Sequence, residues 1–287
     1  MSTLAIIGGT GLYHIGNLDK IESVSISTPF GDPSDPIIRG EIDNIKLLFL
    51  SRHGRGHIYA PHRVNYRANI YALKQLGAEQ IISVSAVGSL QETIHPGDIV
   101  LVDQYIDRTR GRPATFFDDY GIVAHVGFAD PTDYALGEAL FRAATKIGAK
   151  VHKGGVYVCI EGPQFSSRAE SNLYRSWRAD VIGMTNLPEA KLAREAELPY
   201  ASIATVTDYD CWHEHEKDVS VEAVIEILKK NVTTVGNLLR AVLAILPDPK
   251  QSPASSALKC AIVTSPESIS PKTLEMLELL IGKYLAR

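Results

Sequence analysis

The chain has 287 residues, of which 45% are hydrophobic and 22% charged, and its formal net charge is −4. This composition is ordinary for a soluble globular protein, and the length suits one large α/β domain or two smaller domains. The charge balance argues against a nucleic-acid-binding protein, which would carry clustered basic residues. Three cysteines without metal-ligand spacing favour reduced thiols and a cytoplasmic location. Neither a membrane span nor a signal peptide is expected, because no apolar run approaches roughly 18 residues.

Short apolar runs rich in Ile and Val alternate along the chain with longer segments of helical periodicity. The predicted strands are residues 4–7, 46–50, 80–84, 98–102, 156–160, 181–184 and 200–206. The predicted helices are residues 65–76, 133–147, 167–177, 188–198 and 220–246. Strands that are apolar throughout and alternate with helices predict an α/β fold with a mixed sheet covered on both faces.

The C-terminal part of the chain differs in composition from the rest. Residues 247–257, with the sequence PDPKQSPASSA, have the composition of a linker. A strand at 259–264 and a helix at 270–285 are predicted beyond it. The sequence therefore predicts a main domain at 1–246 and an extension at 247–287 that packs on or near the same domain.

Four clusters of small or polar residues each follow a predicted strand, which is where open α/β sheets bind ligands. They are GGTG (8–11), SRHGR (51–55), SAVGS (85–89) and TDYD (207–210). A glycine-rich turn and an arginine beside a histidine suit an oxyanion, and paired carboxylates suit acid catalysis or recognition of an amine. Each cluster taken alone is explained at least as well by a turn, a solvated loop or a helix cap.

Other chemical motifs find little support. His213-Glu214-His215-Glu216 lacks the spacing of a zinc motif and has no evident fourth ligand, so it is interpreted as a polar loop. His14 stands where the dinucleotide-binding fingerprint requires glycine, and no Gly-x-Ser-x-Gly motif indicates a hydrolase triad.

Taken together, seven stretches resemble the trimeric purine nucleoside phosphorylase family, and within it the enzymes that act on 5′-methylthioadenosine. They are IIGGTGL (6–12), TPFGDPSD (28–35), RHGRGH (52–57), VNYRANIYALK (64–74), GDIVLVDQYIDRT (97–109), IEGPQFSSRAES (160–171) and TDYDCWHEHE (207–216). The resemblance covers about residues 4–246. It implies a single α/β domain with a central mixed β-sheet flanked by helices, assembled as a homotrimer with its sites near the subunit interfaces.

The same resemblance implies the reaction. The expected activity is phosphorolysis of 5′-methylthioadenosine to adenine and 5-methylthioribose 1-phosphate. Inorganic phosphate is a co-substrate, and no metal, organic cofactor, nucleic acid or membrane is involved.

Roles for individual residues follow from the matching positions. The implied phosphate contacts are Thr10, Arg52, His53, Ser85, Ala86 and Thr185. The implied nucleoside contacts are Phe165, Ser166, Met184, Asp208, Asp210 and His125, of which His125 reaches into the neighbouring subunit's site. Asp208 is the implied catalytic residue, because a protonated carboxyl can neutralise N7 of the leaving purine. Asp210 accepts from the exocyclic amino group of adenine.

Substrate choice rests on a few of these positions. The 6-oxopurine enzymes of the family carry Asn at the place of Asp208 and an acidic residue at the place of Ser166, so both residues here are of the adenine type. Val221, Val224 and Ile225 form an apolar stripe at helical spacing that suits a 5′-thiomethyl group, although such a stripe can equally be core.

Three other functions remain open. They are a broader nucleoside phosphorylase acting on adenosine, 5′-deoxyadenosine or 6-oxopurine nucleosides, a hydrolytic nucleosidase, and a nucleoside-binding protein without catalysis. Two residues depart from the family pattern: Ser85 replaces a threonine, and Gly183 stands before Met184 where other residues are frequent.

Overall fold

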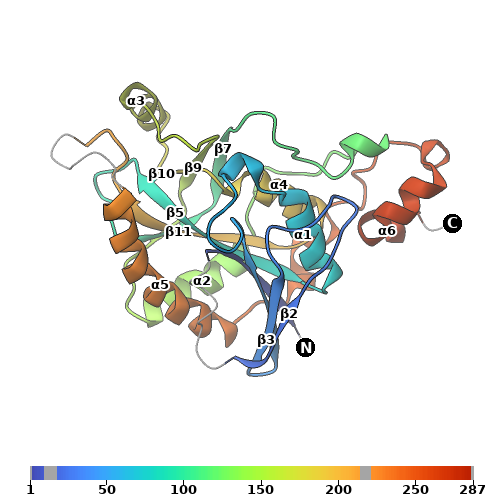
Figure 1. The fold of residues 1–287 in the computed structure, drawn as a ribbon, viewed down its shortest axis with the longest axis horizontal. Helices are drawn as coiled ribbons and strands as arrows, with labels where there is room; N and C mark the ends of the chain where they lie inside the picture. Colours follow the sequence, from blue (N-terminus) through green and yellow to red (C-terminus); the bar gives the residue numbers. More distant parts are fainter. Residues whose placement is uncertain (1, 10–17, 214–220, 286–287) are drawn as a thin grey trace.

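A mixed β-sheet runs through the molecule and carries helices on both faces (Figure 1). The structure is a computed structural model that describes residues 2–9, 18–213 and 221–285, the side chains of 221–226, 228 and 229 excepted. Its strands are β1 (Thr3–Gly8), β2 (Asp19–Val24), β3 (Ile37–Ile42), β4 (Ile45–Ser51), β5 (Gln80–Ser89), β6 (Ile99–Val102), β7 (Gln104–Arg108), β8 (Val151–Lys153), β9 (Val156–Ile160), β10 (Val181–Gly183) and β11 (Tyr200–Asp208). Its α-helices are α1 (Tyr66–Gln75), α2 (Tyr134–Lys146), α3 (Arg168–Ser176), α4 (Asn186–Glu195), α5 (Val221–Leu243) and α6 (Pro271–Leu285).

The centre of the sheet is parallel, which brings several strand ends to one edge. β1 pairs in parallel with both β4 and β5, and β5 pairs in parallel with β11. In this register Ile82 on β5 lies between Ile6 on β1 and Ala201 on β11. The carboxyl ends of these four strands therefore meet, and loops that carry function collect there.

Two buried layers hold the helices on the sheet. Helices α2 and α5 pack on one face, where Leu136 and Leu239 join the same apolar cluster as Ile82. Helices α1 and α4 cover the other face, with Ile70 and Leu192 in the second cluster. The fold is thus a single domain with a central mixed sheet between helices, as the sequence predicted.

Side-chain caps start three of the helices where the sequence placed them. Asn65 accepts a hydrogen bond from the Ala68 N–H at the start of α1, and Asp133 caps α2 in the same way. Ser167 and Glu170 form a complete capping box before α3. Each cap satisfies backbone N–H groups that the helix leaves without a partner.

The start of α4 is unusual and bears on the active site. Leu187, inside this element, has an extended backbone with φ −118° and ψ 135°, so regular helical geometry begins at Pro188. Pro188 is therefore the first residue with regular helical geometry, as the predicted helix at 188–198 required. In the turn before it, Leu187 packs in the apolar core, while Asn186 is buried and bonded to side chains of the sheet.

The predicted strands and the C-terminal helix are confirmed, but the strand predicted at 259–264 is wrong. These residues form turns, and their only strand-like pairing in the described structure is one bridge between Ile262 and Ala124. Four strands were not predicted: β2, β3, β7 and β8. β2 and most of β7 are exposed, and β8 has only three residues, so they lack an apolar pattern.

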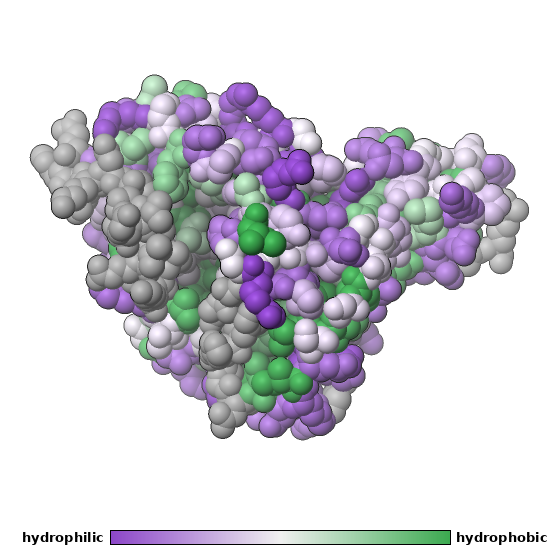
Figure 2. Space-filling model, in the orientation of Figure 1, coloured by the Kyte–Doolittle hydropathy of each residue, from purple (hydrophilic) through white to green (hydrophobic). Residues whose placement is uncertain are grey.

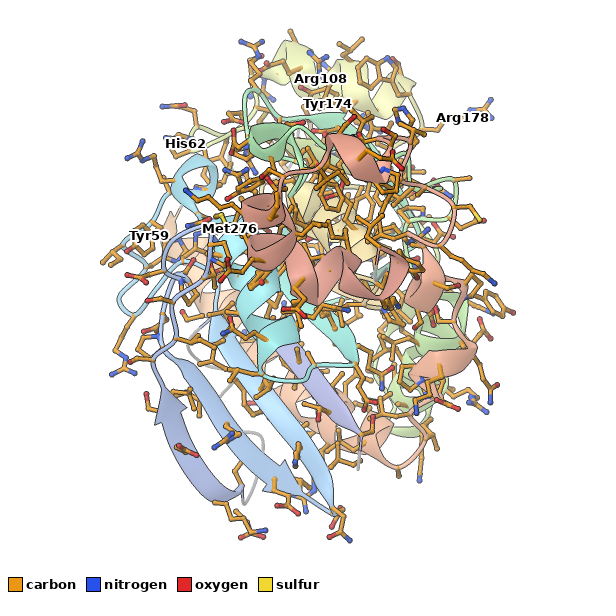
Figure 3. All side chains as sticks on the ribbon, turned by 90° about the vertical axis from the view of Figure 1, so that its right-hand side faces the viewer. Tyr59, His62, Arg108, Tyr174, Arg178 and Met276 are labelled. Carbon is orange, nitrogen blue, oxygen red and sulfur yellow. The ribbon has the colours of Figure 1, made fainter. Side chains whose placement is uncertain are left out.

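The C-terminal extension packs on the main body. Leu277 and Leu280 of α6 lie in the same apolar cluster as α1, and Tyr71 of α1 donates a hydrogen bond to the carbonyl of Met276. Met276 is labelled on α6 in Figure 3. Glu197 accepts from the Leu258 N–H. The extension is continuous with the core of the domain.

The described surface has no large apolar face in the view of Figure 2. Hydrophilic residues predominate there, and apolar residues gather in small separate groups. Across the described ranges, no helix has both the length and the apolar character that a membrane crossing requires.

Candidate active site

A cavity of about 380 Å³ lies where β4, β5, β10 and β11 end. Residues that the sequence placed in separate motifs line this one cavity: Arg52, His53, Ser85, Ala86, Phe165, Ser166, Met184, Thr185, Asp208 and Asp210. The parallel centre of the sheet explains the convergence, because it delivers the carboxyl ends of neighbouring strands to the same edge. Met184 and Thr185 reach it from the turn after β10.

The other predicted site residues are placed differently. Thr10 lies outside the described residues, and so do the side chains of Val221, Val224 and Ile225 on α5. The following part of α5 supplies Asn231, Val232 and Val235 to the cavity wall. His125 is exposed and does not line the cavity of its own chain. Its role at a neighbouring subunit stays a prediction.

Arg52 is buried, and its guanidinium is held from behind the cavity. Its Nε donates to Glu189 Oε2 at 2.7 Å, and its Nη2 donates to Glu189 Oε1 at 3.0 Å. Burial alone would lower the pKa of Arg52, but the charge and hydrogen bonds of Glu189 outweigh burial and raise it. The arginine therefore stays charged and fixed in one orientation.

His53 stands beside Arg52 in its neutral form. Its Nδ1 lies 2.8 Å from the carbonyl oxygen of Tyr59, an acceptor only, so Nδ1 carries the proton. Burial, together with the charge of Arg52, lowers the pKa of His53 to about 4. In this tautomer Nε2 is an acceptor, suited to a protonated oxygen of a phosphate ion.

Ser85 and Thr185 also have buried polar partners. Ser85 Oγ donates to Asn186 Oδ1 at 3.1 Å, and Asn186 Nδ2 donates to Tyr105 Oη at 3.0 Å. The Thr185 N–H points to Tyr157 Oη at 3.4 Å. The Ser85 hydroxyl and the backbone of Thr185 are thus held by neighbours, which reduces the entropy lost when an anion binds.

The glycine at 183 has a steric explanation in the structure. A Cβ at Gly183 would lie 2.1 Å from Tyr157 Oη, far inside van der Waals contact. The tyrosine approaches the backbone there and meets the Thr185 N–H. The glycine at 183 therefore leaves the space that Tyr157 occupies. Ser85, the other residue that departs from the family pattern, keeps a hydroxyl in the cavity.

Asp208 and Asp210 form a carboxylate side of the cavity, further along β5 than Arg52, because Asp208 pairs with Gly88 while Arg52 donates to the carbonyl of Val84. Asp208 Oδ2 accepts from Thr207 Oγ1 at 2.7 Å, and Oδ1 accepts from the Asp210 N–H at 2.8 Å. Burial raises the pKa of both carboxyls, and the charge of Asp208 raises that of Asp210 further. A carboxyl with a raised pKa keeps its proton to higher pH and can donate it to a ligand.

Phe165 and Ser166, which also line the cavity, have groups left uncovered by the described residues. The buried Ser166 Oγ has no hydrogen-bond partner among the described residues. Phe165 is 52% exposed at the cavity, which is unusual for a large apolar ring. A planar aromatic ligand with polar edges would cover the ring and satisfy the hydroxyl.

Comparison with known proteins agrees with this geometry. Residues 3–244 match the family model of the phosphorylase superfamily. The S-methyl-5′-thioadenosine phosphorylases of Geobacter sulfurreducens and Thermosynechococcus vestitus are each 52% identical to the chain, over 98% of it and 99% of their own length.

The chain belongs to the phosphorylase superfamily.

Solved structures in the same superfamily share the fold. A methylthioadenosine phosphorylase from an antarctic soil metagenomic library superposes with a TM-score of 0.92, at 49% identity over 97% of this chain and 98% of its own. The methylthioadenosine phosphorylase of Schistosoma mansoni in complex with adenine gives 0.85, at 36% identity over 91% and 99%. The resemblance seen in the sequence is confirmed at the level of the family.

Three residues that shape this phosphorylase-superfamily site were missed from the sequence: Glu189, Asn186 and Arg112. Arg112 Nη1 donates to the carbonyls of Met184 and Leu187 at 2.8 and 2.9 Å, and its Nε donates to Glu161 at 3.0 Å. None lies in a motif that suggests ligand binding. A signal was available only for Asn186, which directly follows the predicted contact Thr185, and for Glu189, which stands in the first turn of the helix that the sequence predicted from Pro188.

Metal ligation has no support in the described part of the chain. No group of three or more His, Cys, Asp or Glu side chains gathers there in a way that would hold an ion. His213 stacks on Tyr209, with ring centroids 4.7 Å apart. The rest of the His213-Glu214-His215-Glu216 stretch lies outside the described residues.

Proposed function

We propose that the chain catalyses phosphorolysis of 5′-methylthioadenosine, giving adenine and 5-methylthioribose 1-phosphate. The observation that carries this proposal is the polarity of the cavity. Arg52, with its neighbour His53, donates to the carbonyl of Val84 beside Ser85, whereas Asp208 pairs with Gly88 further along β5. The pKa values of Asp208 and Asp210 are raised. Relatives that carry the name S-methyl-5′-thioadenosine phosphorylase match over nearly the whole chain, which supports the same substrate here.

The two sides divide the chemistry of the reaction. Phosphate on the Arg52 side attacks C1′ as the bond from C1′ to N9 of the purine breaks, and it offsets the positive charge that develops on the sugar. The electron pair of that bond leaves with the purine. Asp208 donates its proton to N7, which neutralises the leaving base, while Asp210 accepts from the exocyclic amino group. Water is not a reactant, so products form only when phosphate is present.

The apolar wall supports the methylthio group. Val232 and Val235 of α5 line the cavity. Val221, Val224 and Ile225 begin the same helix and are proposed to continue this surface. A thiomethyl group buries well against valine and isoleucine, whereas a 5′-hydroxyl would lose hydrogen bonds to water there.

We further propose a cytoplasmic homotrimer that needs no metal and no organic cofactor. The exposed position of His125, outside its own cavity, is compatible with a contact to a neighbouring subunit's nucleoside. Sedimentation equilibrium tests the trimer, and a dimer or monomer would contradict it. Activity that survives exhaustive dialysis against a chelator supports the absence of a metal.

The decisive experiment measures adenine release from 5′-methylthioadenosine with and without phosphate. Release that requires phosphate, with formation of 5-methylthioribose 1-phosphate, is expected. Release without phosphate would identify a nucleosidase. Binding without any product would identify a nucleoside-binding protein. Faster cleavage of adenosine, 5′-deoxyadenosine or inosine in parallel assays would replace the methylthio substrate with a broader one.

A further inference from the structure

Glu189 is a buried carboxylate on α4, immediately behind the cavity wall. It is 1% exposed and does not itself line the cavity. Its Oε1 accepts from Arg52 Nη2 at 3.0 Å, from Ser83 Oγ at 2.6 Å and from Tyr200 Oη at 2.9 Å. Its Oε2 accepts from Arg52 Nε at 2.7 Å. A buried charge with this many partners is held rigidly, because any displacement would break several bonds.

The contacts of Glu189 determine where the guanidinium of Arg52 points. A guanidinium has five N–H groups. Two are bonded to Glu189, one to Ser83 Oγ and one to the carbonyl of Val84. The two-point contact with a carboxylate defines the plane of the arginine fork. One Nη1 N–H has no acceptor among the described residues, and its direction follows from that plane.

Arg52 is the permanent cation in the described wall of the cavity. It is the one lysine or arginine among the described residues that line it. His53 beside it is neutral at ordinary pH, because burial and the charge of Arg52 lower its pKa to about 4. Within the described cavity wall, capture of an anion therefore depends on the placement of a single fixed cation, whose own charge is partly balanced by Glu189.

We propose that Glu189 is a positioning residue that orients Arg52 for inorganic phosphate and so sets the affinity for phosphate but not for the nucleoside. This inference rests on the proposed phosphorolysis. Without the carboxylate, the guanidinium of Arg52 rotates toward other acceptors, and its remaining Nη1 N–H no longer points at the phosphate. The carboxylates proposed to recognise the purine, Asp208 and Asp210, stand at the end of β11 and just after it, away from Glu189, and are unaffected.

The test is the variant Glu189→Gln in the full-length chain. The KM for phosphate is expected to rise about tenfold or more, while the KM for 5′-methylthioadenosine stays within about twofold. Calorimetric titration with inorganic phosphate should show the same loss of affinity without turnover. A phosphate KM that falls would show that Glu189 competes with phosphate for Arg52, and would overturn the proposal. Equal rises in both KM values would reduce Glu189 to a structural role.

Two controls separate positioning from general loss of stability. Tyr200→Phe removes one hydrogen bond to Glu189 but leaves its pair with Arg52 intact, so stability falls and the phosphate KM is unchanged. In an Arg52→Met background, Glu189→Gln should cause no further loss of phosphate affinity, because Glu189 acts through Arg52. Additive losses would contradict the proposal. Should Glu189→Gln fail to fold, Glu189→Asp keeps the charge, withdraws the carboxylate from Arg52 and is expected to raise the same KM.

Assays of the unsubstituted chain distinguish a failure of this inference from a failure of the proposed function. If it releases adenine without phosphate, the proposed phosphorolysis fails. If its reaction requires phosphate and Glu189→Gln leaves the phosphate KM unchanged, only the positioning role of Glu189 fails.

Discussion

Gly88 on β5 faces Asp208 on β11 so closely that a Cβ at Gly88 would lie 2.8 Å from Asp208 Oδ1. The same atom would lie 3.3 Å from the Cβ of Asp210. The absence of a side chain at 88 therefore makes room for both carboxylates, which stand on the last residues of one strand and its loop.

Replacing this glycine should displace Asp208 and slow the reaction. Gly88→Ala is expected to lower kcat/KM for 5′-methylthioadenosine by about 10- to 100-fold, since a shift of a catalytic group by about 1 Å can cost that much. Gly137→Ala on α2 is the matched control, because an added Cβ there meets nothing within 4 Å. Steady-state kinetics of both variants make the comparison. Similar rates for the two would show that Gly88 is not spatially required.

Asp208→Asn should change base selectivity. An amide can donate to a 6-oxo group but no longer supplies a proton to N7, so the variant should use adenine nucleosides less well and 6-oxopurine nucleosides better. The ratio of kcat/KM between 5′-methylthioadenosine and 5′-methylthioinosine is expected to fall roughly tenfold or more. These substrates differ only in the base, so the ratio isolates the contact at position 208. An unchanged ratio would remove Asp208 from base recognition.

The raised pKa of Asp208 predicts how activity depends on pH. Burial raises this pKa above the ordinary value of 3.8 and outweighs the hydrogen bonds from Thr207 and the Asp210 N–H, which lower it. The proton-donating form therefore persists above the ordinary range and is lost as pH rises through the raised pKa. The pH profile of kcat/KM should show a descending limb that Asp208→Asn lacks. A limb that survives in the variant must belong to another group.

Arg112 should matter for the nucleoside wall rather than for phosphate. Its donors hold the carbonyls of Met184, Leu187 and Glu161, so one side chain joins the turn after β10 to the end of β9. Arg112→Lys cannot make these contacts at once and is expected to raise the nucleoside KM about tenfold and lower stability by about 2 to 4 kcal/mol. Arg110→Lys, at an exposed position nearby, is the control. Kinetics and urea unfolding of both variants test the difference.

Glu195 should make stability depend on pH. Burial raises its pKa from 4.5 to about 7, although the Phe116 N–H bond opposes this. The folded state thus binds the proton more tightly than the unfolded state, and the stability this confers is lost as pH rises from about 4.5 to about 7. Glu195→Gln, which keeps an acceptor for Phe116, should gain about 2 to 3 kcal/mol over the parent between about pH 5 and pH 8. Urea unfolding measures the stability of both proteins as a function of pH. A difference between Glu195→Gln and the parent that does not change with pH would contradict this prediction.

Much of the fold was predictable because its central elements are short-range patterns. β1 and β11 are buried along almost their whole length and contain apolar runs, and α3 begins with a capping box that local sequence encodes. β2 was not predictable, since its exposed residues follow no apolar period. The strand predicted at 259–264 failed because this segment lies at the surface and pairs through a single bridge.

The sequence by itself determined the family, the α/β class and which residues follow the strand ends, because motif order and apolar periodicity are properties of neighbours along the chain. Only the tertiary structure decided which way those residues face and what holds them. Arg52 and Glu189 are separated by 137 positions, so no local sequence pattern predicts that this arginine pairs with Glu189 outside the cavity. The raised pKa values of Asp208 and Asp210 likewise arise from burial, which depends on how the parallel strands bring their ends together.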